Sequence, residues 1–262
     1  MRLDKMLGNL GYGTRSEIKK FCRQGMVIVN GEEAKKSDIH VNPELDEVLF
    51  NGKKVNYREF IYLMLNKPSG YVSATFDKYE PTVIELIDEK YYTFEPFPVG
   101  RLDKDTEGLL ILTNDGQLSH RVLSPKKHVP KKYYAIIDRL VKTCDIEYFE
   151  KGIDIGEEHM TKPAKLEFIG KGTDVDFDNL FNTENEFFVE KKFDFKDGLG
   201  AEVYITISEG KFHQIKRMFN AVGKEVLYLK RIKMGELQLD ETLELGEYRE
   251  LTAEEISMLE GK

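Results

Sequence analysis

The first sixty residues carry helical and then strand-like hydrophobic patterns. Apolar side chains at Leu3, Met6, Leu7 and Leu10 follow the i, i+3, i+4, i+7 spacing of an amphipathic helix. The sequence TRSE at 14–17 is a capping box, in which the threonine hydroxyl and the glutamate satisfy backbone donors of a new helix. We therefore predict two short helices, separated by a Gly-Tyr-Gly break, with the second ending near Gly25.

Short apolar runs follow these helices. Residues 27–29 and 48–50 are each followed by Asn-Gly, which favours a tight turn between strands. Residues 56–60 are polar, and we place a linker there. These patterns predict a small domain over residues 1–58.

The rest of the chain mixes strand and helix patterns. Strands are predicted at 62–65, 109–112, 131–137, 164–169, 202–208, 226–229, 237–239 and 243–251. Helices are predicted at 82–87, 118–123, 144–151 and 214–222, with a last one capped at 252–255. Asn114-Asp115-Gly116 reads as a turn that closes the strand before it. Strands outnumber helices, which favours an α+β domain over residues 59–262 with a mixed or antiparallel sheet.

Composition limits the class of protein. No run of about 18 apolar residues exists, which argues against a membrane-spanning helix, and the charged N-terminus does not resemble a signal peptide. Cys22 and Cys144 lie far apart with no histidine cluster beside them, which argues against a zinc site or a disulfide framework. We expect a cytoplasmic protein without a metal or other cofactor.

The charge is unevenly distributed. The net charge is −8, yet residues 141–198 hold 15 acidic and 8 basic residues, a net −7. Residues 205–235 hold 7 basic and 2 acidic residues, a net +5, and residues 1–40 hold 8 and 5, a net +3. Basic segments on either side of an acidic one fit a protein that grips phosphate with part of its surface. The acidic, phenylalanine-rich residues 170–198 read as an insertion.

Charged residues gather before one buried strand. In VGRLDKDTEGLLILTNDG at 99–116, Arg101, Asp103, Lys104 and Asp105 directly precede the apolar run. A charged loop pinned to a buried strand is how a scaffold presents a reactive side chain. The alternative is a solvated salt-bridge cluster, which contributes little.

Two other segments carry candidate chemistry. In SEGKFHQIKRMF at 208–219, the helical period places Lys216 at the border of the apolar face and Arg217 nearly opposite it. Lys216 is thus placed to reach inward and Arg217 to meet phosphate, whereas His213 reads as structural or as an RNA contact. In KKYYAII at 131–137, the adjacent tyrosines fit core packing in a strand as well as a site.

These three segments together resemble the pseudouridine synthases that modify ribosomal RNA, the RsuA/RluB type. The resemblance implies that Asp103 is the nucleophile, that Lys216 pairs with it, and that a tyrosine in a Lys-x-Tyr-x-(Val/Ile) motif lies beside it. Residues 132–136 fit that motif best and make Tyr134 the candidate, although a shift by one residue would select Tyr133. Arg101 and Arg217 are expected to contact the RNA.

The N-terminal region has a resemblance of its own. RLDKxL, YGTR and GxVxVNG resemble the small RNA-binding domain of the S-four type, named after a small-subunit ribosomal protein. The resemblance implies RNA-backbone contacts, which position a protein without reading sequence. The residues implicated are Arg2, Lys5, Arg15, Lys19, Lys20 and Arg23.

The resemblance implies isomerisation of a uridine, which consumes no reagent. The HQ(I/V)KRMF string favours the small-subunit enzymes of the 16S rRNA pseudouridine-516 type. A synthase acting on 23S rRNA or tRNA, or a non-catalytic ribosome assembly factor, remains an alternative. Asp103 must be ionised in its role, which a cation such as Lys216 favours; attack at the sugar and assistance to elimination are both open. The expected partner is ribosomal RNA, with no membrane and no dedicated protein partner.

Overall fold

The computed structural model describes residues 1–124, 127–171 and 200–260. Nearly all of the proposed insertion at 170–198 falls outside these residues. Contacts among the chain's segments divide it into two compact units, Met1–Ile61 with Ile87–Pro96, and Tyr62–Leu86 with Phe97–Lys262. The assignment of Ile87–Pro96 to the first unit has no counterpart in the sequence patterns.

The first unit contains two helices and a small antiparallel sheet. Its elements are α1 (Leu3–Asn9), α2 (Arg15–Arg23), β1 (Val27–Val29), β2 (Glu32–Glu33), β3 (Val48–Phe50), β4 (Lys53–Lys54) and the 3-10 helix η2 (Glu89–Phe94). The sheet order is β2-β1-β3-β4. The capping box forms as predicted, with Thr14 and Glu17 satisfying each other's backbone donors. Leu3, Leu7 and Ile18 are fully buried in the core, which confirms the predicted helical faces.

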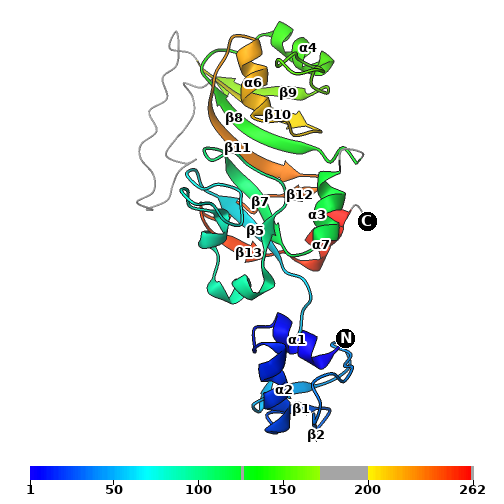
Figure 1. Ribbon diagram of the computed structural model, residues 1–262. Helices are drawn as coiled ribbons and strands as arrows, with labels where there is room; N and C mark the ends of the chain where they lie inside the picture. The colour runs from blue at the N-terminus through cyan, green and yellow to red at the C-terminus, as the bar shows by residue number, and fades with distance from the viewer. Residues whose placement is uncertain (125–126, 172–199, 261–262) are drawn as a thin grey trace. The chain divides into compact units, whose positions relative to one another are not determined.

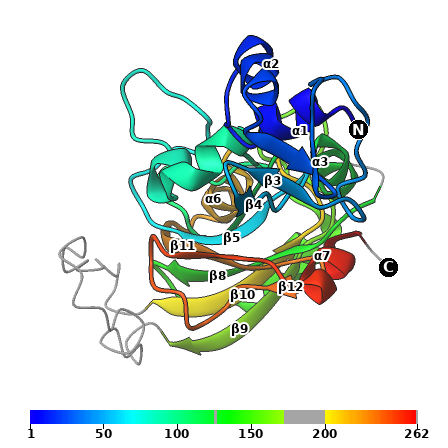
Figure 2. The ribbon, with the colours of Figure 1, turned by 90° about the horizontal axis from the view of Figure 1, so that it is seen from below.

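The second unit is built on a mixed sheet (Figure 1). Its strands are β5 (Tyr62–Lys67), β6 (Phe97–Pro98), β7 (Glu107–Thr113), β8 (Lys131–Ile137), β9 (Lys165–Lys171), β10 (Ala201–Ile207), β11 (Val226–Met234), β12 (Leu237–Gln238) and β13 (Tyr248–Glu250). The order is β13-β5-β7-β11-β8-β10-β9, with β6 pairing β7 and β12 pairing β11. Figure 2 shows β11, β8, β10 and β9 side by side in that order.

One parallel pairing joins the halves of this sheet. All described pairs of its strands are antiparallel except β7 with β11, where Glu107 lies opposite Lys230 and Gly108 opposite Arg231. Gly108 has a φ of +99°, and a β-carbon there would lie 2.2 Å from the carbonyl oxygen of Arg231. Only glycine permits so close an approach of two backbones. The predicted α+β class with a mixed sheet is confirmed.

Helices cover parts of the sheet. They are η1 (Val83–Leu86), α3 (Gly116–Leu123), α4 (Thr143–Lys151), α6 (Gln214–Ala221) and α7 (Ala253–Glu260). Helices α3 and α7 lie side by side (Figure 1) and share an apolar core with β5, β7, β11 and β12. No helix among the described residues is long and apolar enough to cross a membrane.

One predicted turn is wrong. Asp115 is the N-cap of α3, and its carboxylate accepts hydrogen bonds from the backbone N–H groups of Gln117 and Leu118. The chain therefore passes from β7 directly into a helix. Asp and Asn favour turns and helix caps through the same short-range hydrogen bonds, so Asn-Asp-Gly fitted both.

Candidate active site

A pocket of about 690 Å³ lies in the second unit, where the ends of several strands meet two loops. Its walls come from residues 100–106, before β7, and from residues 207–216, between β10 and α6. Tyr133, Leu229 and Arg231 contribute from β8 and β11. Asp103 and Lys216 both line it, so the structure brings together two groups that lie more than a hundred residues apart.

Asp103 sits on a loop that a buried lysine holds in place. Lys67 is fully buried at the end of β5, and its Nζ donates to the backbone oxygens of Asp103, Lys104 and Thr106 at 3.2, 3.2 and 2.9 Å, and to that of Pro68. Burial lowers the pKa of Lys67 to about 8, although nearby carboxylates oppose this shift. Lys67 was missed as a site residue, because its NKP segment reads from sequence as a turn.

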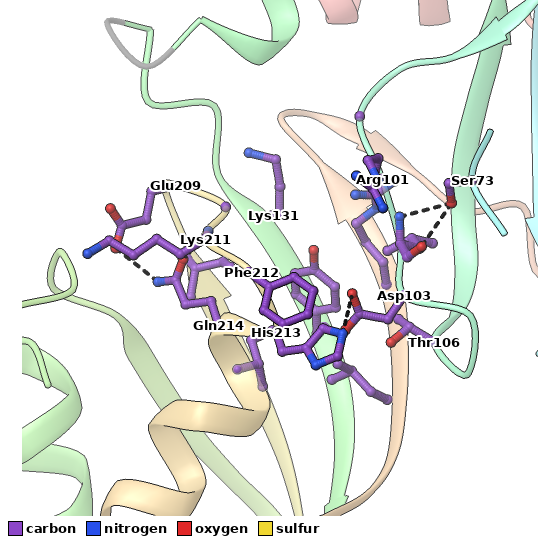
Figure 3. A pocket seen from close by; sticks show the side chains of 18 of the residues that line it. Ser73, Arg101, Asp103, Thr106, Lys131, Glu209, Lys211, Phe212, His213 and Gln214 are labelled. Atoms are coloured by element: carbon purple, nitrogen blue, oxygen red, sulfur yellow. Dashed lines mark hydrogen bonds and ion pairs between the residues drawn. The ribbon is translucent and has the colours of Figure 1, made fainter. Parts of the chain in front are cut away.

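A second contact fixes the loop on the side of Leu102. The Ser73 hydroxyl donates to the backbone oxygen of Leu102 at 2.9 Å and accepts from its N–H at 3.0 Å. Because Ser73 and Leu102 are both buried, water does not compete for these bonds. The loop is therefore pre-organised, and the Asp103 side chain, which is 29% exposed, projects into the pocket (Figure 3).

Two nitrogen groups face the Asp103 carboxylate, one toward each oxygen. Lys216 Nζ lies 3.7 Å from Oδ2, and His213 Nε2 lies 3.6 Å from Oδ1. Lys216 is closer to Asp105, whose two carboxylate oxygens accept hydrogen bonds at 2.5 and 2.6 Å. Burial tends to raise the pKa of Asp105, but the bond to Lys216 and its charge prevail, and that pKa is lowered. The Lys216 cation therefore favours the ionised form of Asp105.

The tyrosine candidate needs correction. Tyr133 lines the pocket, whereas Tyr134 points to the opposite face of the sheet and donates to the Glu202 carboxylate at 2.6 Å. Tyr134 packs there with Tyr228 and Ile136. Adjacent residues of a strand face opposite ways, so a motif shift of one residue exchanges pocket for far face. Burial, followed by the bond to Glu202, raises the pKa of Tyr134.

Of the two arginine candidates, only Arg101 lines the pocket. Arg101 is exposed and lines the pocket (Figure 3). Arg217 is turned away from it: its guanidinium donates to the Glu157 carboxylate at 2.6 Å and to the backbone oxygen of Phe212 at 3.1 Å. Internal partners hold the Arg217 guanidinium, and its contact with phosphate stays a prediction.

Phe212 and His213 shape the mouth of the pocket. Phe212 is 72% exposed and stacks on the imidazole of His213, with ring centroids 3.8 Å apart. His213 has a φ of +47°, in the left-handed region that residues with a β-carbon rarely adopt. Strain of this kind gathers at functional sites. Sequence patterns do not place His213 against Asp103, because no periodic pattern reveals a left-handed residue before a helix.

The N-terminal candidates all lie on the surface of the first unit. Arg2, at the start of α1, pairs with the buried carboxylate of Asp4 at 2.6 Å. All six predicted residues are exposed: Arg2, Lys5, Arg15, Lys19, Lys20 and Arg23. No group of acidic, histidine or cysteine side chains that could hold a metal occurs in the described part of the chain.

Comparisons with known proteins agree with this architecture. Residues 61–221 match the family model of RNA pseudouridylate synthase, and residues 1–48 match that of the S4 domain. The class is thus an RNA-modifying isomerase with an S4 domain at its N-terminus. The chain belongs to the RNA pseudouridylate synthase family, and it is a pseudouridine synthase.

Its relatives match over nearly their whole length. A Bacillus subtilis (strain 168) protein named uncharacterized RNA pseudouridine synthase YtzG is 48% identical over 99% of this chain and 98% of that protein. Ribosomal small subunit pseudouridine synthase A of Escherichia coli (strain K12) is 37% identical over 98% and 99%. A crystal structure of a pseudouridylate synthase superposes with a TM-score of 0.61 at 38% identity, covering 99% of both chains.

Proposed function

We propose that this protein converts uridine 516 of 16S ribosomal RNA into pseudouridine, with Asp103 as the nucleophile. The observation that supports the proposal most directly is the position of the Asp103 carboxylate, which lies in the pocket 3.7 Å from Lys216 Nζ. Lys67 holds the loop that carries Asp103 by hydrogen bonds to its backbone. The small-subunit substrate is supported by full-length relatives named ribosomal small subunit pseudouridine synthase A, at 37–39% identity.

The chemistry requires no reagent besides the RNA. A carboxylate oxygen of Asp103 attacks C1′ of the ribose, and the N1–C1′ bond breaks with its electron pair leaving on the uracil. The uracil turns so that C5 faces C1′, and a C5–C1′ bond forms as the carboxylate departs. The C5 proton then leaves to solvent and N1 takes up a proton, which gives the neutral product. Lys216 stabilises the carboxylate before attack and after departure.

The base must leave its stack to reach Asp103. This extrusion costs a few kcal/mol and is least costly where pairing is irregular. Tyr133, in place of Tyr134, offers a ring on which the uracil can stack, and Arg101 offers a cation to the backbone at the pocket mouth. Residues 1–58, through the six predicted basic side chains, all of them exposed, would position the enzyme by phosphate contacts. A cytoplasmic location follows from this substrate.

Tritium release from 5-³H-uridine transcripts tests the proposal. We would compare 16S transcripts, small-subunit particles and 23S transcripts, and map pseudouridine in each by chemical probing. Conversion confined to position 516 supports the proposal. Conversion of a 23S uridine, or of a 16S uridine elsewhere, would overturn the substrate assignment while leaving the enzyme class intact. We expect Asp103→Asn to be inactive in the same assay on every RNA. This result tests the role of Asp103 independently of which uridine is the substrate.

A further inference from the structure

A buried arginine lies beneath the pocket with an unused donor. Arg231 is 1% exposed, and its Nε donates to the backbone oxygen of Leu109 at 2.7 Å. Its Nη2 is closed to solvent and meets no acceptor among the described residues. Arg231 nevertheless lines the pocket that holds Asp103. Buried donors of native proteins are nearly always paired, so this exception calls for a partner that the described part of the chain does not supply.

A second unused donor lies in the same pocket. Thr106, directly before β7, lines the pocket, and its buried hydroxyl also has no partner in the described chain. A guanidinium stays charged in any protein environment, and an uncompensated charge in a closed site is costly. Two unsatisfied donors in one pocket therefore indicate a ligand oxygen, and the guanidinium favours one that carries negative charge.

The register of the sheet shows which part of a substrate can reach Arg231. Arg231 on β11 lies directly opposite Tyr133 on β8, and both side chains belong to the pocket face. Directly opposed residues have β-carbons about 5 Å apart. A uracil stacked on Tyr133 therefore has an edge over Arg231, and the carbonyl oxygens of uracil lie on its edges. This step rests on the proposed role of Tyr133.

We propose that Arg231, with Thr106 as a second donor, stabilises the negative charge that uracil acquires when its bond to ribose breaks. When N1–C1′ cleaves, the electron pair enters the uracil ring and spreads onto the carbonyl oxygens. Arg231 Nη2 donates to one of these oxygens, and the ring loses its negative charge when its electron pair forms the C5–C1′ bond. The C5 proton then leaves and N1 takes up a proton, so the ring stays neutral. A donor fixed before the reaction in a site without water stabilises such charge most effectively.

The experiment changes the charge of Arg231 and the stability of the leaving uracil together. Single-turnover loss of the target nucleoside is measured for wild type and Arg231→Met on RNA carrying uridine or 5-fluorouridine at that position. Fluorine stabilises the uracil anion, so less help from the protein is needed. We expect Arg231→Met to react about 100-fold more slowly on uridine, the effect typical of losing one such donor. On 5-fluorouridine we expect a markedly smaller loss.

The dependence on substrate distinguishes this role from a structural one. Arg231→Met removes a buried charge but also removes the Nε hydrogen bond to the Leu109 carbonyl oxygen, so stability alone does not separate the two roles. A structural arginine would give an equal rate loss on both substrates; that pattern would overturn the proposal. Thr106→Val should show the same substrate dependence with a smaller loss. If Arg231→Met does not fold, Arg231→Lys, which loses the Nη2 donor but keeps the charge, takes its place in the comparison.

Lys230→Met is the matched control. Lys230 precedes Arg231 on β11 and is also a basic residue. Burial lowers its pKa, and its side chain faces the other side of the sheet, opposite Tyr134. We expect wild-type rates on both substrates. The target nucleoside is uridine 516 if the wild-type assay converts it, and otherwise the uridine that mapping identifies. Failure of the substrate assignment and failure of the Arg231 proposal are thereby separate results.

Discussion

Lys216 lies between two carboxylates, with Nζ 2.5 Å from an oxygen of Asp105 and 3.7 Å from an oxygen of Asp103. Asp105 is the closer partner, yet it is 68% exposed, so its attraction is screened by water. Asp103 is 29% exposed and faces the pocket. The same ammonium is therefore anchored by one carboxylate and available to the other.

We expect Lys216→Met to lower kcat/KM by about 100-fold, because the cation beside Asp103 is lost where charge develops. Lys216→Arg should restore most of this loss. Asp105→Asn should reduce kcat/KM by about fivefold or less, because Lys216 keeps Asp103 as a partner and an exposed pair contributes little. Steady-state kinetics of the three variants measure this. A larger loss in Asp105→Asn than in Lys216→Met would show that the cation serves Asp105 instead.

Replacing the nucleophile separates catalysis from binding. Asp103→Asn keeps the shape of the side chain but removes its charge, so we expect no detectable pseudouridine, while the Kd for RNA stays within a few fold. Tritium release measures turnover, and filter binding measures affinity. Asp105→Asn is the matched control, with the same change two residues away. Turnover near the wild-type level in Asp103→Asn would refute the assigned role.

The adjacent tyrosines form a natural pair for mutation. We expect Tyr133→Leu to lower kcat/KM by about 5- to 100-fold, the range for loss of one base–aromatic stack. Tyr134→Phe removes a hydrogen bond to the Glu202 carboxylate and should cost about 1–2 kcal/mol of unfolding free energy with kcat unchanged. Kinetics and urea denaturation measure both. The reverse pattern would restore Tyr134 as the active-site residue.

These tyrosines show that sequence patterns predict a strand but not which of its faces points to the pocket. Periodicity located α2, β8 and the alternating faces of β10 almost residue by residue, because burial of one face dictates each. The motifs likewise put Asp103 and Lys216 in one pocket. The assignment of Tyr134 failed because both alignments of the motif are equally good strands, and only pairing with neighbouring strands decides which face is inward.

Sequence patterns did not predict the buried basic residues that lie beneath the site. Lys67 lies in a segment that reads as a turn, and Arg231 lies beyond the strand predicted at 226–229, yet both side chains are almost completely buried. Lysine and arginine are so rarely buried that composition argues against it. Their burial depends on carbonyl oxygens and a pocket that distant segments assemble, which a local pattern does not record.

We expect Lys67 to make the enzyme sensitive to alkaline pH. Its Nζ serves four backbone oxygens, and its pKa is lowered by burial from 10.5 to about 8. The neutral amine keeps only two N–H donors, so the Asp103 loop loosens as pH rises through about 8. We expect kcat/KM to fall with an apparent pKa near 8.

Global stability should move the other way over the same range. The folded chain releases the Lys67 proton near pH 8, whereas the unfolded chain holds it until about 10.5. Between these values the unfolded state binds more protons, so this group's contribution to the free energy of unfolding rises with pH. Activity and stability should therefore diverge above pH 8, which parallel kinetics and urea denaturation from pH 6.5 to about 9.5 would reveal.

Lys67→Met removes the titrating group. We expect this variant to be slow at every pH and to lack the alkaline decline, because its loop is not held at any pH. Lys151→Met, on the exposed surface of α4, should keep the wild-type profile. If Lys67→Met retains the decline near pH 8, the titrating group lies elsewhere. If wild-type activity and stability fall together, the decline reflects unfolding of the whole unit and the loop is not its cause.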